Sequence, residues 1–293
     1  MTAPVRPRRS VLYMPGSNAR ALAKARTLPA DALILDLEDA VAPAAKDEAR
    51  EQIVAALAEG GYGGREVVVR INGLETEWGG ADMAAIAKTA ADAILIPKVE
   101  GKATVAEVER AMEMARARHE MAIWCMIETA LGVLHAEEIA GSSDRIAALV
   151  MGTSDLAKDL HCLHTPMRLP LIASLNICVL AARAYGLAIV DGVHLDLADA
   201  DGFAQACVQG RELGFDGKTL IHPKTIEEAN EVFAPSPGDV EWSRRIIAAH
   251  REAAAEGKGM VLVDGKLIEN LHVEEAHRLV ELAAAIAALQ AAG

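Results

Sequence analysis

The stretch "DALILDLEDAVAPAAKDEAR", residues 31–50, decides the fold. It begins with a continuous apolar run, places Asp36, Glu38 and Asp39 within four positions, and ends in an alanine-rich segment of helical period. A strand buried on both faces has such a run, and a helix that directly follows it is typical of a parallel sheet. The stretch therefore predicts a strand followed by a helix, with acids at the carboxyl end of the strand.

The same unit recurs along the chain. The eight apolar runs, each followed by an alanine-rich or helix-period segment, are residues 10–16, 31–39, 66–72, 91–99, 122–128, 146–155, 187–193 and 217–223. Eight such units over about 225 residues predict a (β/α)₈ TIM barrel. A doubly wound open sheet is the rival fold, but no GxGxxG follows the first run, and "MPGSNARALAKA" lacks the pattern of a Walker loop.

The pattern changes after the eighth unit, at the proline- and glycine-rich stretch "FAPSPGD", residues 233–239. We therefore expect a barrel domain over residues 1–233 and a C-terminal extension over residues 234–293. The extension is predicted to contain a helix that ends at Gly257, a hairpin around Asp264 and Gly265, and a last helix within residues 273–291.

Composition limits the classes of function. The chain has 293 residues, 52% of them hydrophobic and only 3% aromatic, which favours a helix-rich core of small aliphatic side chains. A net charge of −13 argues against nucleic-acid binding. The four cysteines show no CxxC spacing and are read as reduced thiols of a cytoplasmic enzyme. No apolar stretch approaches the roughly 18 residues of a membrane span, so no membrane partner is expected.

The first 30 residues are basic although the chain as a whole is acidic. They contain no acid and six basic residues, which are Arg6, Arg8, Arg9, Arg20, Lys24 and Arg26. Three interpretations stay open: a binding surface for a phosphorylated ligand, a solvated basic tail, and a transit peptide, which is the least favoured because strand-like sequence begins by residue 10.

Polar residues stand at the carboxyl ends of the predicted strands, where TIM barrels place their active sites. Glu128 and Asp155 belong to consecutive units, so their strands should be neighbours about 4.8 Å apart. Two carboxylates without a cluster of His or Cys suit Mg²⁺, with Mn²⁺ as the alternative ion. The competing interpretation is that each acid caps the helix that follows it. Asp191, at the seventh strand end, either touches substrate or begins a loop.

Arg70 follows three consecutive valines, so its guanidinium should emerge from a buried strand and bind an anion. Two partners stay open: the carboxylate of a ligand, and the internal acids Asp36 or Glu38. Strand alternation places Asp36 and Glu38 on one face and Asp39 on the other. We expect Asp36 and Glu38 to orient Arg70 and to accept hydrogen bonds from the waters of the metal.

The chain resembles the citrate lyase beta-subunit-like branch of the HpcH/HpaI aldolase superfamily over nearly its whole length. The blocks that carry the resemblance are "RSVLYMPGSNARALAKA", "DALILDLEDAVAPAAKDEAR", "VRING", "ILIPKVE", "MIETALGV", "MGTSDLAKDL" and "GFDGKTLIHPKTI". The resemblance implies a barrel that binds Mg²⁺ through Glu128 and Asp155 and a substrate carboxylate through Arg70.

Beside the resemblance stand expectations for the residues that bind coenzyme A, act in catalysis or contact substrate. Coenzyme A is expected near the first strand and its loop, at Tyr13, Ser17, Arg20 and Lys24. Arg70 and Asp36 are expected to act in catalysis. The residues expected to contact substrate are Arg70, Gly152, Thr153 and Glu38.

Family members make or break a carbon–carbon bond beside a CoA thioester, but the tail of this chain departs from the common pattern. Many relatives carry an aspartate in a segment like "DGKMID", supplied to a neighbouring subunit, whereas here "DGKLIENLH" has Glu269 at that place. This tail is more similar to the branch of (3S)-malyl-CoA thioesterases, in which Glu269 is expected to act as a general base. The competing interpretation makes Glu269 a cap of the last helix, although Asn270 is at least as good a cap.

The resemblance therefore implies an Mg²⁺-dependent enzyme that hydrolyses (S)-malyl-CoA to malate and CoA. One alternative is a lyase that cleaves malyl-CoA, citramalyl-CoA or citryl-CoA to acetyl-CoA and a 2-oxoacid. Another is a citrate lyase beta subunit that acts in a complex with an acyl carrier protein. The expected partners are an acyl-CoA, a small hydroxy or oxo acid and further copies of the chain, as a trimer or hexamer.

Overall fold

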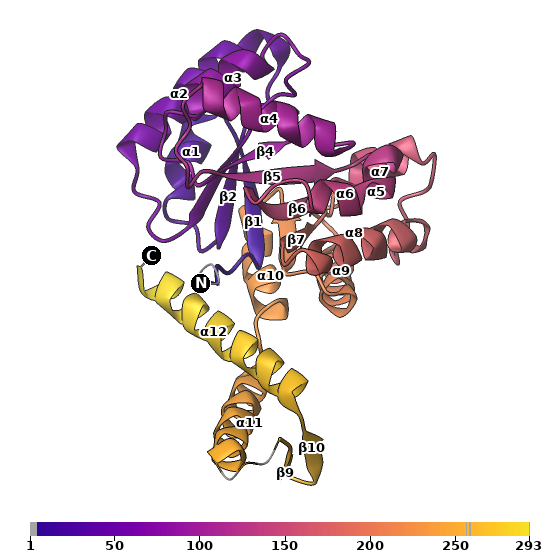
Figure 1. Ribbon diagram of the computed structural model, residues 1–293. Coiled ribbons are helices and arrows are strands. Elements are labelled where there is room, and N and C mark those ends of the chain that lie inside the picture. Colours follow the sequence, from indigo (N-terminus) through magenta and orange to yellow (C-terminus); the bar gives the residue numbers. More distant parts are fainter. Residues whose placement is uncertain (1–4, 256, 258, 293) are drawn as a thin grey trace. The chain divides into compact units, whose positions relative to one another are not determined.

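Eight parallel strands form a closed barrel in the computed structural model (Figure 1). Each strand pairs in parallel with the next, and β8 pairs with β1. The strands are β1 (Ser10–Pro15), β2 (Ala32–Asp36), β3 (Glu66–Arg70), β4 (Ala93–Ile96), β5 (Ala122–Ile127), β6 (Ile146–Met151), β7 (Ala188–Asp191) and β8 (Gly217–Leu220). The predicted TIM barrel is confirmed, and each strand lies within a predicted apolar run.

Helices connect the strands and cover the outside of the barrel (Figure 1). They are α1 (Ala19–Ala25), α2 (Lys46–Glu59), α3 (Gly79–Ile86), α4 (Lys102–Met114), α5 (Ala130–Leu134), α6 (Ala136–Ala140), α7 (Thr153–Asp159), α8 (Ile172–Ala184), α9 (Ala200–Leu213) and α10 (Ile226–Val232), with short 3₁₀ turns at Pro43–Ala45, Leu169–Leu171 and Pro223–Thr225.

Strand alternation produces two separate apolar cores. In β2, Ala32 and Ile34 belong to the core inside the barrel, whereas Leu33 and Leu35 belong to the core between the barrel and its helices. Both faces of each strand are therefore buried, which explains why the strands appear as continuous apolar runs. The same alternation decides which polar residues at the strand ends face the interior.

An ion pair lies near the amino-terminal end of the strands. Arg8 donates from Nε and Nη2 to the two carboxylate oxygens of Glu66, at 2.7 and 2.9 Å, and its guanidinium lies 5.2 Å from the ring centroid of Trp124. Arg9 forms a buried pair with Asp31, and Arg26 pairs with Glu59. Arg8, Arg9 and Arg26 therefore have ion-pair partners within the fold.

A smaller unit contains the residues from Ala234 onward with residues 5–7, while the barrel unit is Arg8–Phe233. The structure describes residues 5–255, 257 and 259–292. The smaller unit consists of α11 (Pro237–Ala255), the antiparallel strands β9 (Val261–Val263) and β10 (Lys266–Ile268), and α12 (Asn270–Ala292). Asp264 and Gly265 both have positive φ, 49° and 77°, as expected for the tight turn of the predicted hairpin.

No helix among the described residues is long and apolar enough to cross a membrane. The four cysteines carry free thiols, and three of them, Cys125, Cys178 and Cys207, are buried.

Candidate active site

The carboxyl end of the barrel gathers charged side chains from several strands. Val68 and Met126 belong to the core inside the barrel, and Arg70 and Glu128 follow them two positions later, on the same face. Asp36 has the same relation to Ile34. Parallel topology then brings these three residues, which are far apart in the sequence, to one end of the barrel.

Asp36 and Arg70 form the centre of this group. The guanidinium donates from Nε to Oδ1 of Asp36 at 2.7 Å and from Nη2 to Oδ2 at 2.6 Å. Asp36 also accepts hydrogen bonds from the backbone N–H groups of Glu38, at 2.9 Å, and Ala40, at 3.2 Å. Each oxygen of Asp36 thus has two donors, so this buried carboxylate fixes both the arginine and the loop after β2.

Arg70 is surrounded by further acids. Its Nη1 lies 2.8 Å from Oε2 of Glu38 and 3.6 Å from Oδ2 of Asp39, and the guanidinium stands 4.9 Å from the ring centroid of Tyr13. Burial alone would lower the pKa of Arg70, but the hydrogen bonds to Asp36 and the surrounding negative charges raise it well above its ordinary value. Arg70 therefore forms the internal ion pair that the sequence left open as one of its two interpretations.

Asp39 lies closer to this group than strand alternation suggests. β2 ends at Asp36, so Asp39 belongs to the following loop, where the alternation of a strand no longer applies. Its side chain is 62% exposed, yet its carboxylate stays near Arg70.

Glu128 is a buried carboxylate with like-charged neighbours. Its Oε1 accepts a hydrogen bond of 2.8 Å from the backbone N–H of Lys98. Burial, followed by the negative charges of Glu38 and Asp155, raises the pKa of Glu128 to about 7, although the Lys98 amide opposes the shift. Within the described residues, Glu128 has no Lys, Arg or His at ion-pair distance. A divalent cation between Glu128 and Asp155 would relieve this repulsion, so the donor set fits Mg²⁺.

Asp155 lies in the first turn of α7, and the loop before it is shaped by glycine. A Cβ at Gly152 would lie 2.4 Å from both Cβ and Oε2 of Glu128, so only glycine leaves room for this carboxylate. A Cβ at Gly192 would lie 2.3 Å from Oγ1 of the buried Thr153. Gly152 therefore lies against Glu128, and Thr153 lies against Gly192. The described residues do not form a group of three or more His, Cys, Asp or Glu side chains that could hold a metal ion by themselves.

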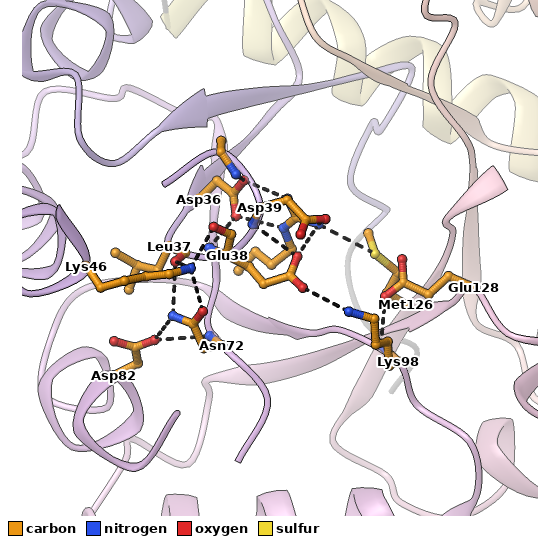
Figure 2. Close-up of polar contacts among 12 residues, drawn as sticks. Asp36, Leu37, Glu38, Asp39, Lys46, Asn72, Asp82, Lys98, Met126 and Glu128 are labelled. Atoms are coloured by element: carbon orange, nitrogen blue, oxygen red, sulfur yellow. Dashed lines mark hydrogen bonds and ion pairs between the residues drawn. The ribbon is translucent and has the colours of Figure 1, made fainter. Parts of the chain in front are cut away.

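Two lysines complete the site and were not assigned roles from the sequence (Figure 2). Lys98 has a positive φ of 49°, and its Nζ lies 3.4 Å from Oε1 of Glu38. Burial alone would lower the pKa of Lys98, but the carboxylates of Glu38, Glu128 and Asp39 raise it. Lys98 is the charged residue near the end of the apolar run of residues 91–99, and this position is the sequence signal that could have indicated it.

Lys46, the first residue of α2, is buried and donates to three acceptors. They are the backbone oxygens of Leu37 and Glu38, both at 2.8 Å, and Oδ1 of Asn72 at 2.7 Å. Asn72 in turn donates to Asp82 at 2.6 Å. This network ties the loop after β2 to the loop after β3, but the sequence around Lys46 carries no signal of it (Figure 2).

A model of the HpcH/HpaI aldolase/citrate lyase family matches residues 9–223, which span the whole barrel. The chain belongs to this family. Its relatives include the (3S)-malyl-CoA thioesterase of Cereibacter sphaeroides, which is 50% identical over 285 residues, or 97% of this chain and 98% of the relative. The citrate lyase subunit beta of Leuconostoc mesenteroides subsp. cremoris is 37% identical, over 94% of this chain and 93% of the relative.

Solved structures of the HpcH/HpaI family share the fold. CitE from Mycobacterium tuberculosis in complex with magnesium, acetoacetate and coenzyme A has a TM-score of 0.74 and 29% identity, and the match covers 95% of this chain and 98% of that chain. A citrate lyase beta subunit from the same organism, complexed with oxaloacetate and magnesium, has a TM-score of 0.67 and 30% identity, over 78% of this chain and 98% of that chain. The predicted family membership is confirmed, and the chain belongs to a family of enzymes.

Of the four residues predicted to contact coenzyme A in this HpcH/HpaI family member, three are exposed and one lies inside the barrel. Ser17, in the loop after β1, and Arg20 and Lys24, one turn apart on α1, are exposed. Tyr13 instead faces the interior of the barrel beside Arg70, and burial raises the pKa of its hydroxyl. This ring therefore packs against Arg70, and the contact of Tyr13 with coenzyme A stays a prediction.

Glu269 directly precedes α12 in the smaller unit of this HpcH/HpaI chain. Its N–H donates to Nδ1 of His272 at 3.1 Å, and its carbonyl oxygen accepts from the N–H of His272 at 3.0 Å. The backbone of Glu269 thus occupies the cap position, while its carboxylate has no hydrogen bond or ion pair within the described part of the chain. Asn270 is the first residue of the helix and not its cap.

Asp191 does not face the candidate site. Val190 belongs to the core inside the barrel, so Asp191 points outward, where it pairs with Arg168 and Lys218, both at 2.7 Å. Burial alone would raise the pKa of Asp191, but these two cations hold it below its ordinary value. Asp191 therefore serves the packing of the helical layer.

Proposed function

We propose that this protein is an Mg²⁺-dependent enzyme that hydrolyses (S)-malyl-CoA to malate and CoA. The observation that carries the proposal is the buried carboxylate of Glu128, which interacts with the charges of Asp155 and Arg70, in a chain 50% identical to a (3S)-malyl-CoA thioesterase over nearly its full length. Two neighbouring carboxylates that form no ion pair with a Lys, Arg or His among the described residues suit a hard divalent ion that also needs oxygen ligands from substrate.

The residues of the chain have distinct roles in this reaction. Glu128 and Asp155 would hold Mg²⁺, with Mn²⁺ as an acceptable substitute, and the bound ion would polarise oxygen atoms of the substrate. Arg70 binds the free carboxylate of the malyl group, while Asp36 keeps the guanidinium in place. Gly152 and Thr153 form the wall of the acyl pocket beside the metal.

The thioester is attacked by water in the proposed reaction. The Glu269 carboxylate of a neighbouring copy accepts a proton from this water, whose oxygen bonds to the thioester carbonyl carbon. The bond between carbon and sulfur then breaks, and the departing thiolate takes up a proton to give free CoA. Because the carboxylate of Glu269 has no partner among the described residues, it is available for this role.

Coenzyme A is proposed to lie against the exposed surface formed by Ser17, Arg20 and Lys24, where the two basic side chains meet its phosphates. Solved CitE from Mycobacterium tuberculosis, similar over 95% of this chain, contains coenzyme A and magnesium. We also propose a cytoplasmic location and a trimeric or hexameric assembly, which would bring the extension of one copy to the barrel of another.

A carbon–carbon lyase is the second candidate, and the similarity to citrate lyase beta subunits favours it. The same site would then cleave malyl-CoA, citramalyl-CoA or citryl-CoA to acetyl-CoA and a 2-oxoacid. A related alternative is that the chain serves as a citrate lyase beta subunit with an acyl carrier protein as partner. Turnover of a free CoA ester by the isolated chain would argue against the need for such a partner.

The assay that separates these activities uses purified protein, (S)-malyl-CoA and Mg²⁺. We expect free thiol and malate in equal amounts, and no release after Mg²⁺ is removed with a chelator. Glyoxylate with acetyl-CoA would instead identify the lyase. Inertness toward malyl-CoA, citramalyl-CoA and citryl-CoA would contradict the proposed substrate class.

A further inference from the structure

Each of the three guanidinium nitrogens of Arg70 already contacts a carboxylate of the protein. Nε and Nη2 are used by Asp36, and Nη1 lies 2.8 Å from Oε2 of Glu38. Asp39 adds a third carboxylate at 3.6 Å. One positive charge is thus surrounded by three negative groups, and Nη1, which also donates to Sδ of Met126 at 3.9 Å, is a nitrogen for which an entering carboxylate must compete with Glu38.

Glu38 is the acid that can leave. Asp36 is held by four donors, whereas the carboxylate of Glu38 has one short contact, to Arg70, and two long ones. The long contacts are 3.3 Å from the N–H of Asp39 to Oε2 and 3.4 Å from Nζ of Lys98 to Oε1. Removing Glu38 from Nη1 therefore breaks a single strong interaction.

The backbone of Glu38 is fixed although its side chain is not. Its N–H donates to Asp36 at 2.9 Å, and its carbonyl oxygen accepts from Nζ of Lys46 at 2.8 Å (Figure 2). Displacement of Glu38 therefore requires only rotation of side-chain bonds, without movement of the loop after β2.

Lys98 is placed to receive the displaced carboxylate. Its Nζ already contacts the oxygen of Glu38 that faces away from Arg70, and its side chain is 51% exposed, whereas that of Glu38 is 11% exposed. A carboxylate that leaves Arg70 on this side moves toward another cation and toward solvent, so it keeps an ionic partner.

We propose that Glu38 is an internal substitute for the ligand's carboxylate: it occupies Nη1 of Arg70 in the free enzyme and turns to Lys98 when a carboxylate ligand binds. This inference rests on the proposed function, in which Arg70 binds the free carboxylate of the acyl group. It makes Glu38 and Lys98 specificity-determining residues, because only a ligand with its own carboxylate can replace Glu38 on Arg70.

The test compares the binding of (S)-malate, with saturating Mg²⁺, to wild-type protein and to Glu38→Gln by titration calorimetry. Loss of the competing charge should tighten binding of malate by about tenfold, equivalent to about 1.4 kcal/mol. Glu38→Ala should give a similar gain if the glutamine variant folds poorly, and thermal unfolding checks both. Dimethyl malate, which lacks carboxylates, should not bind the variants more tightly than the wild type.

Asp39→Asn is the matched control, because it removes one negative charge at the adjacent position. A general change of charge predicts equal gains in the two variants, whereas the proposal predicts a much smaller gain for Asp39→Asn. Lys98→Met should weaken malate binding when Glu38 is present, but it should have little effect on malate binding in the Glu38→Gln background. A double-mutant cycle over Glu38 and Lys98 measures this coupling.

Unchanged or weaker malate binding by Glu38→Gln and Glu38→Ala would overturn the inference, as would equal gains in Asp39→Asn. So would the absence of malate binding by all these proteins. The outcome is separate from that of the proposed function, which is judged by the products that the wild type forms from malyl-CoA.

Discussion

At the scale of single residues, the proposed role of Glu128 as a metal ligand links metal binding to the protonation of its carboxylate. Its pKa in the metal-free fold is about 7, above its ordinary value, because burial and the charges of Glu38 and Asp155 disfavour the ionised form. When folding raises the pKa of a carboxyl group, that group contributes to the free energy of unfolding at low pH. This contribution is lost as the pH rises through the pKa of the folded state. Metal-free protein should therefore lose stability between about pH 4.5 and pH 7.

Glu128→Gln should remove this loss. Glutamine keeps an oxygen for the N–H of Lys98 but carries no charge, so at pH 8 without metal the variant should be more stable than the wild type by up to about 3 kcal/mol. Urea unfolding with a chelator present, from pH 5 to pH 8, measures the difference. Mg²⁺ should then stabilise the wild type and not the variant. Parallel pH profiles for both proteins would refute the assignment of Glu128 as the titrating metal ligand.

Arg70→Lys tests whether the site needs the two hydrogen bonds that the guanidinium donates to Asp36. A lysine offers one ammonium in place of a planar fork, so it cannot satisfy both oxygens of Asp36 and also face a ligand. We expect kcat/KM to fall by about 100-fold or more. Arg26→Lys, which changes an arginine outside this site, is the control and should keep full activity. Near-normal turnover by Arg70→Lys would exclude Arg70 as the carboxylate-binding group.

At the scale of secondary-structure elements, the start of α2 determines where the site's acids stand. Lys46 joins the loop after β2 to Asn72 through three hydrogen bonds, and its Nζ lies 5.2 Å from the ring centroid of Trp78. Lys46→Met would leave Oδ1 of Asn72 without its donor, whereas the oxygens of Leu37 and Glu38 keep hydrogen bonds from Asn72 and Val41, so the change should cost about 1–3 kcal/mol of stability. Faster hydrogen exchange at the amides of Glu38 and Ala40 would accompany it. The exposed Lys88→Met is the control, and equal effects of the two changes would contradict this role.

Elements were predicted well because their signals are local. A continuous apolar run predicts a strand buried on both faces, and parallel topology then places Asp36, Arg70 and Glu128 at one end of the barrel. Interactions between distant residues carry no comparable signal: nothing in the sequence indicates that Lys46 reaches Asn72. The outward direction of Asp191, in contrast, follows from the alternation that places Val190 inside.

At the scale of the whole molecule, the chain consists of a large barrel unit and a small extension. The extension has a modest apolar core of Ile246, Ile268 and Ala276, with partly buried side chains around it. Its hairpin and the start of α12 expose large apolar side chains, which are Met260, Leu262, Leu267 and Leu271. Such side chains around Glu269 fit a segment that packs against another copy of the chain.

Subunit mixing tests whether the extension completes the site of a neighbouring copy. Glu128→Gln damages the barrel and Glu269→Gln damages the extension, so each variant alone should be nearly inactive. If each site combines a barrel and an extension from different copies, random reassembly of equal amounts should restore about a quarter of the sites. The recovered activity is measured after joint dissociation and reassembly, with each variant treated alone as control. If both residues of a site come from one copy, mixing restores nothing, because every copy in the mixture carries one of the two defects.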